Sequence, residues 1–397
     1  MVPKGWKKLI GEEIADKITK GSSPKWQGFD YQDSGCLFVT SENVREGYLD
    51  ISKPKYLPLE FNEKLKNSQL KQGDILINIV GASIGRSCLI QKDISPANIN
   101  QAVCLFRVKK NISHEYVSFY LQAPHIVRKL LGSQTESARP NLSLSDLRSF
   151  SFDIPPIFEQ EKIASILSTW DEAIEKLEKL IETKKKRKKG LMQQLLNPKK
   201  KYGKLPDGWK LKKMEECVKY EGGAQPPRDT FIFEERLGYI RLIQIRDYKT
   251  DNFKTYIKEE LARKKCTKED VMIGRYGPPI FQVLRGIEGA YNVALMKAIP
   301  RDGLDREYMY YFLSQEKIER YLDGFSQRSA GQAGIEMDML LSYPFPLPTK
   351  KDQEKIVVVL TAVDKEISLY HAKLDKLKNQ KKGLMQQLLT GKKRVQI

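Results

Sequence analysis

Residues that could carry out catalysis or hold a metal are few and scattered in this 397-residue sequence. There are three histidines, and no two of the five cysteines form a Cys-x-x-Cys pair, so neither a disulfide framework nor a zinc site is indicated. The sequence contains no Asn/Asp-Pro-Pro-aromatic motif of an amino-methyltransferase, no Walker A motif and no GxGxxG loop. We therefore predict no catalytic residue, no metal site and no directly bound cofactor.

The net charge is the strongest chemical signal, because 69 Lys and Arg outnumber 50 Asp and Glu and give +19. Such an excess favours a polyanionic partner, of which nucleic acid is the leading candidate. Part of the excess, Lys184–Lys189 and Lys199–Lys201, has a second explanation, since cations also suit the C-terminal end of a helix. Isolated Lys and Arg in the rest of the chain are not covered by that explanation.

Double-stranded DNA would be held through Lys and Arg on its phosphates and read through planar side chains at base edges. Polar loops contain the candidates for both roles. In the first half of the chain these are Ser22, Ser23, Lys25, Ser41, Asn43, Arg45, Ser83, Arg86, Asn98, Asn100, Gln101, Ser137, Arg139 and Asn141. In the second half they are Gln225, Arg228, Gln244, Arg246, Arg275, Tyr276, Gln327, Arg328, Ser329 and Gln332. Arg139 and Arg328, in corresponding loops, are the first choices for base contacts, although a solvated surface role is commoner for a single arginine.

A repeated segment would position these loops. Residues 154–196 begin IPPIFEQEKIA and end KKGLMQQLL, and the second copy begins FPLPTKKDQEKI and ends in the same way, with Gln160 matched to Gln353. Each copy starts after prolines and stops near Asn197 or Gly391, which are helix boundary signals. At ~1.5 Å per residue, about 40 residues give a helix of roughly 60 Å.

Apolar residues recur in each copy at steps of three and four, which predicts one narrow apolar seam per helix. The first seam is Ile163, Ile166, Trp170, Ile174, Leu177 and Ile181, followed beyond a basic break by Leu191 and Leu195. The second is Ile356, Val359, Val363, Ile367, Tyr370, Leu374, Leu377, Leu384 and Leu388. A seam of this length needs a partner, and the other copy is the nearest one. The alternative is that each helix packs separately on its own domain.

The segments that precede the two helices are related more loosely. Each opens with Gly-Trp-Lys, at Gly5 and at Gly208, and FVTSENVREGYLD from Phe38 is matched with YIRLIQIRDYKTD from Tyr239. The patterns predict an α+β chain in which two similar mixed α/β globular domains, residues 1–153 and 201–346, are each followed by a long helix, residues 154–200 and 347–397. Because the polar loops agree less than the helices, the halves would read two different targets, although drift in surface loops would give the same picture.

This order of globule, helix, globule and helix resembles the specificity (S) subunit of type I restriction-modification systems. The marks of the resemblance are Gly-Trp-Lys at each domain start, GDILI at Gly73–Ile77, SIGR at Ser83–Arg86, IPP with QEKIA before the first helix, and the two GLMQQLL ends. They span nearly the whole chain. The second domain departs from the pattern, since EDVMI and PPIFQ stand where GDILI and SIGR would be expected.

The resemblance implies a non-catalytic DNA-recognition subunit. Each globule would be a target recognition domain that reads one half of a bipartite, asymmetric DNA sequence. The two helices would pair as an antiparallel coiled coil with pseudo-two-fold symmetry, acting as spacer and as docking site for two methyltransferase (M) subunits. Restriction (R) subunits would join for cleavage, and S-adenosylmethionine would bind to the methyltransferase partner.

Two other functions stay open from the sequence. A stand-alone DNA-binding scaffold or transcription-factor-like protein fits the basic charge, although no helix-turn-helix or basic-zipper order is visible. An enzyme that acts on nucleic acid itself is less favoured, because no catalytic constellation is found. No signal peptide, lipidation motif or transmembrane run is visible, and we expect a cytoplasmic protein.

Overall fold

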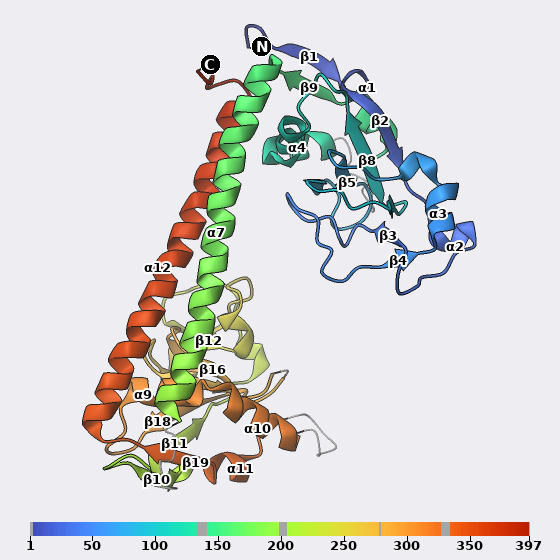
Figure 1. The fold of residues 1–397 in the computed structure, drawn as a ribbon. Coiled ribbons are helices and arrows are strands. Elements are labelled where there is room, and N and C mark those ends of the chain that lie inside the picture. Colours follow the sequence, from blue (N-terminus) through green and yellow to red (C-terminus); the bar gives the residue numbers. More distant parts are fainter. Residues whose placement is uncertain (1–2, 133–140, 198–204, 278, 327–333, 397) are drawn as a thin grey trace. The chain divides into compact units, whose positions relative to one another are not determined.

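The computed structural model describes residues 3–132, 141–197, 205–277, 279–326 and 334–396. The chain divides into two compact units, one formed by Met1–Lys179 with Ala372–Ile397 and the other by Leu180–His371. Two long helices, α7 (Ile157–Leu196) and α12 (Lys350–Leu388), each contribute one part to each unit (Figure 1). Each unit therefore consists of one globular domain and a segment of both helices.

The described residues of the globular domain of the first unit form three sheets. β1 (Lys7–Ile10) pairs with β9 (Ser151–Ile154), which joins the start of the domain to its end. An antiparallel sheet has the strand order β2 (Ala15–Lys20), β8 (Val103–Val108), β5 (Ile75–Asn78) and β6 (Ser87–Leu89). The third sheet has the order β4 (Tyr56–Leu57), β3 (Cys36–Val39) and β7 (Ala97–Ile99), with β3 and β7 parallel.

The helices of this domain are α1 (Gly11–Ile14), α2 (Pro24–Gln27), α3 (Leu59–Lys64), α4 (His114–Gln122), α5 (Pro124–Leu131) and α6 (Leu144–Ser149). Strand β5 lies between two cores because its successive side chains point to opposite faces. Ile75 and Ile77 pack in a core with the aromatic residues of α4, whereas Leu76 packs in a second core with residues of β3 and β7. This explains why the three consecutive residues Ile75–Ile77 of GDILI are all apolar.

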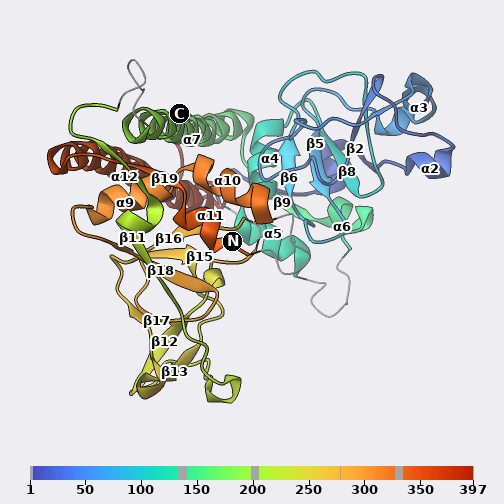
Figure 2. The ribbon, with the colours of Figure 1, turned by 90° about the horizontal axis from the view of Figure 1, so that it is seen from below.

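The globular domain of the second unit repeats this topology. β10 (Lys210–Lys213) pairs with β19 (Pro344–Leu347), and a four-stranded sheet has the order β11 (Val218–Gly222), β18 (Leu295–Pro300), β15 (Val271–Gly274) and β16 (Gln282–Leu284). A further sheet has the order β13 (Tyr256–Lys258), β12 (Tyr239–Ile243), β17 (Gly289–Tyr291) and β14 (Lys265–Cys266). Figure 2 shows this last sheet at the end of the domain away from α9 (Arg306–Leu313), α10 (Glu316–Ser326) and α11 (Met337–Leu341). The remaining helix, α8 (Met214–Cys217), follows β10 as α1 follows β1.

The strand orders of the two domains correspond element by element. The pairing of β14 with β17 has its counterpart in the first domain as a single bridge between Gln69 and Asn98. Strand β15 also repeats the division of side chains seen in β5, since Val271 and Ile273 belong to one core and Met272 to another. The prediction of two similar mixed α/β domains, each followed by a long helix, is confirmed.

The two long helices run antiparallel within each unit. In the first unit, Lys381 Nζ lies 2.5 Å from the Asp171 carboxylate and Lys378 Nζ lies 2.6 Å from that of Glu178. In the second unit, Lys188 Nζ lies 2.6 Å from the Asp364 carboxylate. Lys188 is the repeat counterpart of Lys381, and Asp171 that of Asp364. The same ion pair is therefore formed once in each unit with the two helices exchanged, as pseudo-two-fold symmetry requires.

In both helices the buried seam differs from the predicted seam at its second position. Leu167 and Leu360 are buried at 0% exposure, whereas Ile166 is half-buried and Val359 is 41% exposed. Of the other predicted seam positions, Ile163, Leu177, Ile181, Ile356, Leu374 and Leu388 are buried, and Trp170, Ile174, Leu191, Leu195, Val363, Ile367, Tyr370, Leu377 and Leu384 are half-buried. The assignment of Val359 to the seam is wrong, because a step of four from Ile356 reaches Leu360.

Lysines continue the seam through the stretch that the sequence suggested was a basic break. Lys188 lies 5.4 Å from the ring centre of Tyr311, and its counterpart Lys381 lies 5.3 Å from that of Phe119. Their stems are half-buried while the ammonium groups reach carboxylates, as expected for long amphipathic side chains. Because α7 continues to Leu196 and α12 to Leu388, each lysine stands before the last turn of its own helix, and the helix-dipole explanation does not account for either.

Candidate nucleic-acid interface

A short turn follows the central parallel strand of each domain and has the same hydrogen bonds in both. The backbone N–H of Thr40 donates to Asn43 Oδ1 at 2.8 Å after β3, and the backbone N–H of Gln244 donates to Asp247 Oδ2 at 2.8 Å after β12. A bond of this kind fixes the turn because a short polar side chain replaces a backbone acceptor. Asn43 and Asp247 are therefore structural counterparts.

The neighbouring parallel strands confirm this alignment. Asn100 N–H donates to Val39 O at 3.0 Å, and Asn292 N–H donates to Ile243 O at 3.1 Å. The correspondence makes Glu42, and not Arg45, the counterpart of Arg246. The sequence match of Phe38 with Tyr239 is therefore wrong by three residues, since it places Arg45 opposite Arg246.

Several predicted base contacts are instead used to hold turns. Asn43 also donates from Nδ2 to Asp50 O at 2.9 Å, and Asn100 Oδ1 accepts from Ala102 N–H at 3.1 Å. Asn98 is buried in β7, where its amide donates to Asn62 and Leu65 and accepts from Ile99. Asn98 has no surface with which to reach a base, so its assignment to the interface is corrected.

The other candidates of the first domain are placed as follows. The hydroxyl of Ser22 accepts a hydrogen bond from Gln27, and Ser23 precedes the first residue of α2. The side chain of Asn78 donates to both the backbone oxygen of Ser41 and the hydroxyl of Ser83, and Arg45 Nε lies 3.5 Å from the Asp50 carboxylate. Lys25 and Arg86 are exposed, and Gln101 is half-buried. Asn141 is exposed, and its backbone forms an isolated antiparallel β-bridge with that of Val80. Ser137 and Arg139 lie outside the described residues. The sequence prediction did not include Trp26 among the interface residues. Its side chain is 79% exposed on α2 beside Lys25, and a large aromatic residue next to the polar stretch Ser-Pro-Lys is the sequence signal that could have identified it.

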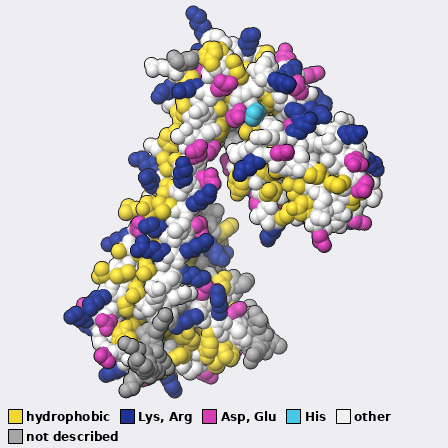
Figure 3. All heavy atoms as spheres, in the orientation of Figure 1, with side chains coloured by type: hydrophobic (Ala, Val, Ile, Leu, Met, Phe, Trp, Pro, Cys, Tyr) yellow, Lys and Arg dark blue, Asp and Glu magenta, His cyan; other side chains and the backbone are white. Residues whose placement is uncertain are grey.

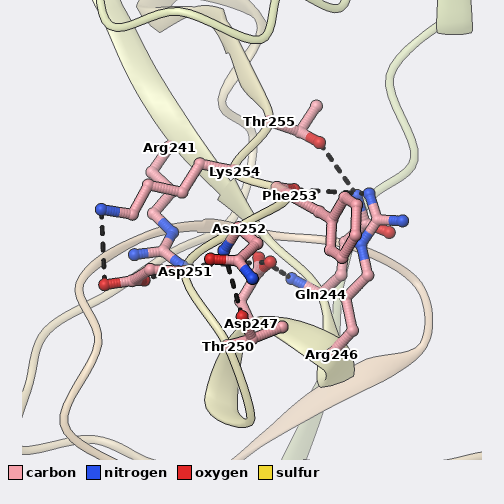
Figure 4. Close-up of polar contacts among 10 residues, drawn as sticks. All are labelled: Arg241, Gln244, Arg246, Asp247, Thr250, Asp251, Asn252, Phe253, Lys254 and Thr255. Carbon is pink, nitrogen blue, oxygen red and sulfur yellow. Dashed lines mark hydrogen bonds and ion pairs between the residues drawn. The ribbon is translucent and has the colours of Figure 1, made fainter. Parts of the chain in front are cut away.

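In the second domain, Arg246 is held against the exposed ring of Phe253. Its guanidinium carbon lies 5.8 Å from the ring centre, and its Nη2 lies 3.5 Å from Phe253 O (Figure 4). Gln244, the other candidate on this turn, donates from Nε2 to Thr255 Oγ1 at 3.3 Å, so its amide is partly engaged. The turn lines a concavity of about 410 Å³ whose wall includes Phe233, Arg246, Asn252, Phe253 and Lys254.

The remaining candidates of the second domain are spread over other loops. Gln225 and Arg228 are exposed, and the Arg275 guanidinium carbon lies 5.5 Å from the ring centre of the partly exposed Tyr276. Gln327, Arg328, Ser329 and Gln332 lie outside the described residues, so the structure does not place them.

The Asp247 carboxylate anchors the turn from a buried position. Burial raises its pKa, although the Gln244 N–H and the charges of Arg241 and Arg246 act in the opposite direction. Arg241 Nη2 lies 3.9 Å from Asp247 and 3.0 Å from Asp251. Ionised Asp247 is therefore less stable in the folded protein than in the unfolded chain. Its ionisation lowers the free energy of unfolding, and this loss is fully present at pH values above the pKa of Asp247 in the folded protein.

Replacing Asp247 by Asn should raise the thermal unfolding temperature of the second unit at pH 8. An amide oxygen can accept the Gln244 bond, as Asn43 does in the first domain, and no charge is buried. The gain should shrink as the pH falls through the raised pKa of Asp247 towards the usual aspartate value of about 4. Thermal unfolding from pH 8 to pH 4 measures it. Asn43→Asp is the matched control and should destabilise the first unit at pH 8; a gain from Asp247→Asn that does not change with pH would contradict this explanation.

A second concavity, of about 470 Å³, lies at the C-terminal part of α7. Its wall includes Lys185, Lys186, Lys189, Lys317 and Arg320. Glu316 is paired there with Lys189 at 2.6 Å and with Arg320 at 2.9 Å, and burial lowers the pKa of Lys317. The excess of cations would attract phosphate groups. On the face drawn in Figure 3, Lys and Arg are scattered over the surface and do not form one patch.

The described residues carry few groups for other chemistry. The five cysteines are buried, and burial raises the pKa of each thiol, to about 11 for Cys36, Cys217 and Cys266 and to about 12 for Cys88 and Cys104. They are therefore protonated at neutral pH and poor nucleophiles. Within the described ranges no three His, Cys, Asp or Glu residues are grouped to hold a metal ion. No helix there combines the length and apolar character needed to cross a membrane.

Known proteins resemble both halves of the chain. Residues 3–185 and 206–379 match the family model of the type I restriction modification DNA specificity domain. The type I restriction enzyme MjaVIII specificity subunit of Methanocaldococcus jannaschii is 23% identical, with 99% of this chain and 94% of the relative covered. The type I restriction enzyme EcoBI specificity subunit of Escherichia coli is 27% identical over 49% of this chain and 41% of the relative.

Solved structures share the fold. A chain of a type I R-M system, from a study of its complex assembly and conformational transition, has a TM-score of 0.63 at 18% identity, with 98% of both chains covered. The S subunit of a type I restriction-modification system from M. genitalium has a TM-score of 0.55 at 15% identity, with 98% of this chain and 96% of that chain covered. Since the family model matches both halves, this chain belongs to the specificity subunits of type I restriction-modification systems.

Proposed function

We propose that the two globular domains read the two halves of one bipartite, asymmetric DNA site, with residues 1–153 and 201–346 as the target recognition domains. The observation that carries this proposal is the combination of a shared strand order with different side chains at equivalent loop positions. Two copies of one scaffold with different contact residues suit two different short sequences. The net charge of +19 supports a DNA partner, because neutralising phosphates supplies much of the affinity of such proteins.

The segments 154–200 and 347–397 act in this proposal as spacer and docking site. The reciprocal Lys188–Asp364 and Lys381–Asp171 pairs support the docking role, since they give the two units the same helix pairing. Two equivalent surfaces on one chain suit two copies of one partner. Two methyltransferase subunits would bind there, and restriction subunits would join for cleavage.

Methyl transfer would occur on the partner in this proposal. S-adenosylmethionine would be bound by the methyltransferase subunits, and this chain would select the DNA sequence. The site of action would be the cytoplasm, where the DNA is accessible. The DNA-contact residues would be exposed polar side chains, among which Lys25, Arg86, Arg228 and Arg246 are available at the surface.

Mapping methylated adenines tests the proposal directly. The chain would be co-expressed with a type I methyltransferase subunit of the same host in cells that lack adenine methylation, and modified bases would be located by single-molecule sequencing. The expected result is one split motif with two different short halves and a fixed gap. If the complex assembles and the methyltransferase is competent but no motif appears, a DNA-binding scaffold without a modification partner becomes the better explanation.

A further inference from the structure

The equivalent turns after β3 and β12 place two oppositely charged side chains at the same position. Glu42 and Arg246 each stand one residue before the residue that closes the turn, Asn43 or Asp247. Both are exposed, and the Glu42 side chain is 77% accessible. The turns leave the ends of parallel strand pairs, β3 with β7 and β12 with β17, so the scaffold presents both side chains in the same way.

The side chain of Arg246 is oriented without being neutralised. The Phe253 ring and carbonyl hold its guanidinium, and the neighbouring Arg241 takes the carboxylate of Asp251. Figure 4 shows Arg241 with Asp251 and Arg246 with Phe253 as separate groups. A planar donor that is held in place, is exposed and has no carboxylate partner among the described residues is suited to bidentate contact with a base edge.

The side chain of Glu42 is engaged only weakly. Its carboxylate lies 3.3 Å from Lys55 Nζ, and both side chains are largely exposed. A surface ion pair of this kind contributes little to stability, so the carboxylate can leave it for a better donor. A carboxylate accepts from the amino group of cytosine, whereas a guanidinium donates to O6 and N7 of guanine.

We propose that Glu42 and Arg246 are corresponding specificity-determining residues, with Glu42 selecting a cytosine in the first half-site and Arg246 a guanine in the second. This inference rests on the proposed function. It goes further because it names one position on the scaffold and the base that each side chain prefers. Phe253 acts as a positioning residue that keeps the Arg246 guanidinium in its reading orientation.

Methylome mapping of variants in the assembled complex tests the assignment. Arg246→Ala should relax one guanine position of the second half-site by about tenfold or more and leave the first half unchanged. Glu42→Ala should relax one cytosine position of the first half-site and leave the second unchanged. Arg246→Glu and Glu42→Arg should exchange the preferred bases at the same positions. Phe253→Leu should weaken selection at the Arg246 position, and Phe253→Tyr, which keeps the ring, should restore it.

Matched controls separate base reading from general effects. Arg236→Ala removes another exposed arginine of the second domain, one that lies over the Tyr239 ring, and Glu63→Ala removes an exposed carboxylate from α3. Both should leave the motif unchanged. A wild-type complex that yields no split motif would contradict the proposed function. A wild-type split motif that survives in all Glu42 and Arg246 variants, or changes in the opposite half, would overturn this inference alone.

Discussion

Leu360→Ala is expected to destabilise the second unit by roughly 2 to 5 kcal/mol. Leu360 is wholly buried on α12, in a core that also contains Ile356 and the aromatic residues Tyr308, Phe312 and Phe345. Truncation would remove apolar contacts and leave a cavity between the helix and its domain, which the packed aromatic rings cannot easily fill. Chemical denaturation followed by hydrogen exchange, resolved to peptides of the second unit, measures the loss.

The neighbouring residue is the control for this prediction. Val359→Ala changes an exposed side chain on the same turn of the helix and should alter the free energy of unfolding by about 0.5 kcal/mol or less. In the first unit, Leu167→Ala should cost about as much as Leu360→Ala, and Ile166→Ala should cost less because Ile166 is half-buried. Equal losses from Leu360→Ala and Val359→Ala would contradict the seam described above.

The seam shows how far a helix can be predicted from its apolar pattern. The pattern identified two long helices and their partnership, because an apolar stripe must be covered. It did not fix the register, since steps of three and four both lead to a neighbouring position on one face, and Ile166 and Val359 satisfy the step of three. Lys188 and Lys381 belong to the seam although they are charged, because their stems are half-buried and their ammonium groups reach carboxylates. Hydrophobicity alone does not reveal such positions.

The candidate site was less predictable than the fold. Asn43, Asn98 and Asn100 have the side chains that read bases, but each is engaged in hydrogen bonds that depend on the folded backbone. The same asparagine types serve in turns and at base edges, so residue type cannot separate the two roles. Glu42 was missed because the loops were matched by letters, whereas the shared turn is defined by its closing Asn or Asp.

Gln160→Leu is expected to cost roughly 2 to 5 kcal/mol in the first unit, because two buried backbone groups would each lose a partner. Gln160 is 1% exposed at the start of α7. Its Oε1 accepts from the N–H of Ser113, the residue that caps α4, at 2.9 Å, and its Nε2 donates to Pro155 O at 2.8 Å. Leucine has a similar size but can replace neither bond. The side chain therefore ties the long helix to the globular domain.

The duplication provides the matched experiment. Gln353 Oε1 accepts from the N–H of Asp305, the cap of α9, at 2.7 Å, and its Nε2 donates to Gly303 O at 2.8 Å. Gln353→Leu should therefore destabilise the second unit by a similar amount, while the exposed Gln194→Leu should have little effect. Hydrogen exchange should report the loss at the first turn of α4 in Gln160→Leu and of α9 in Gln353→Leu. If exchange rose equally in both units after either substitution, each glutamine would be acting on global stability, and its assignment as a local tie between helix and domain would be wrong.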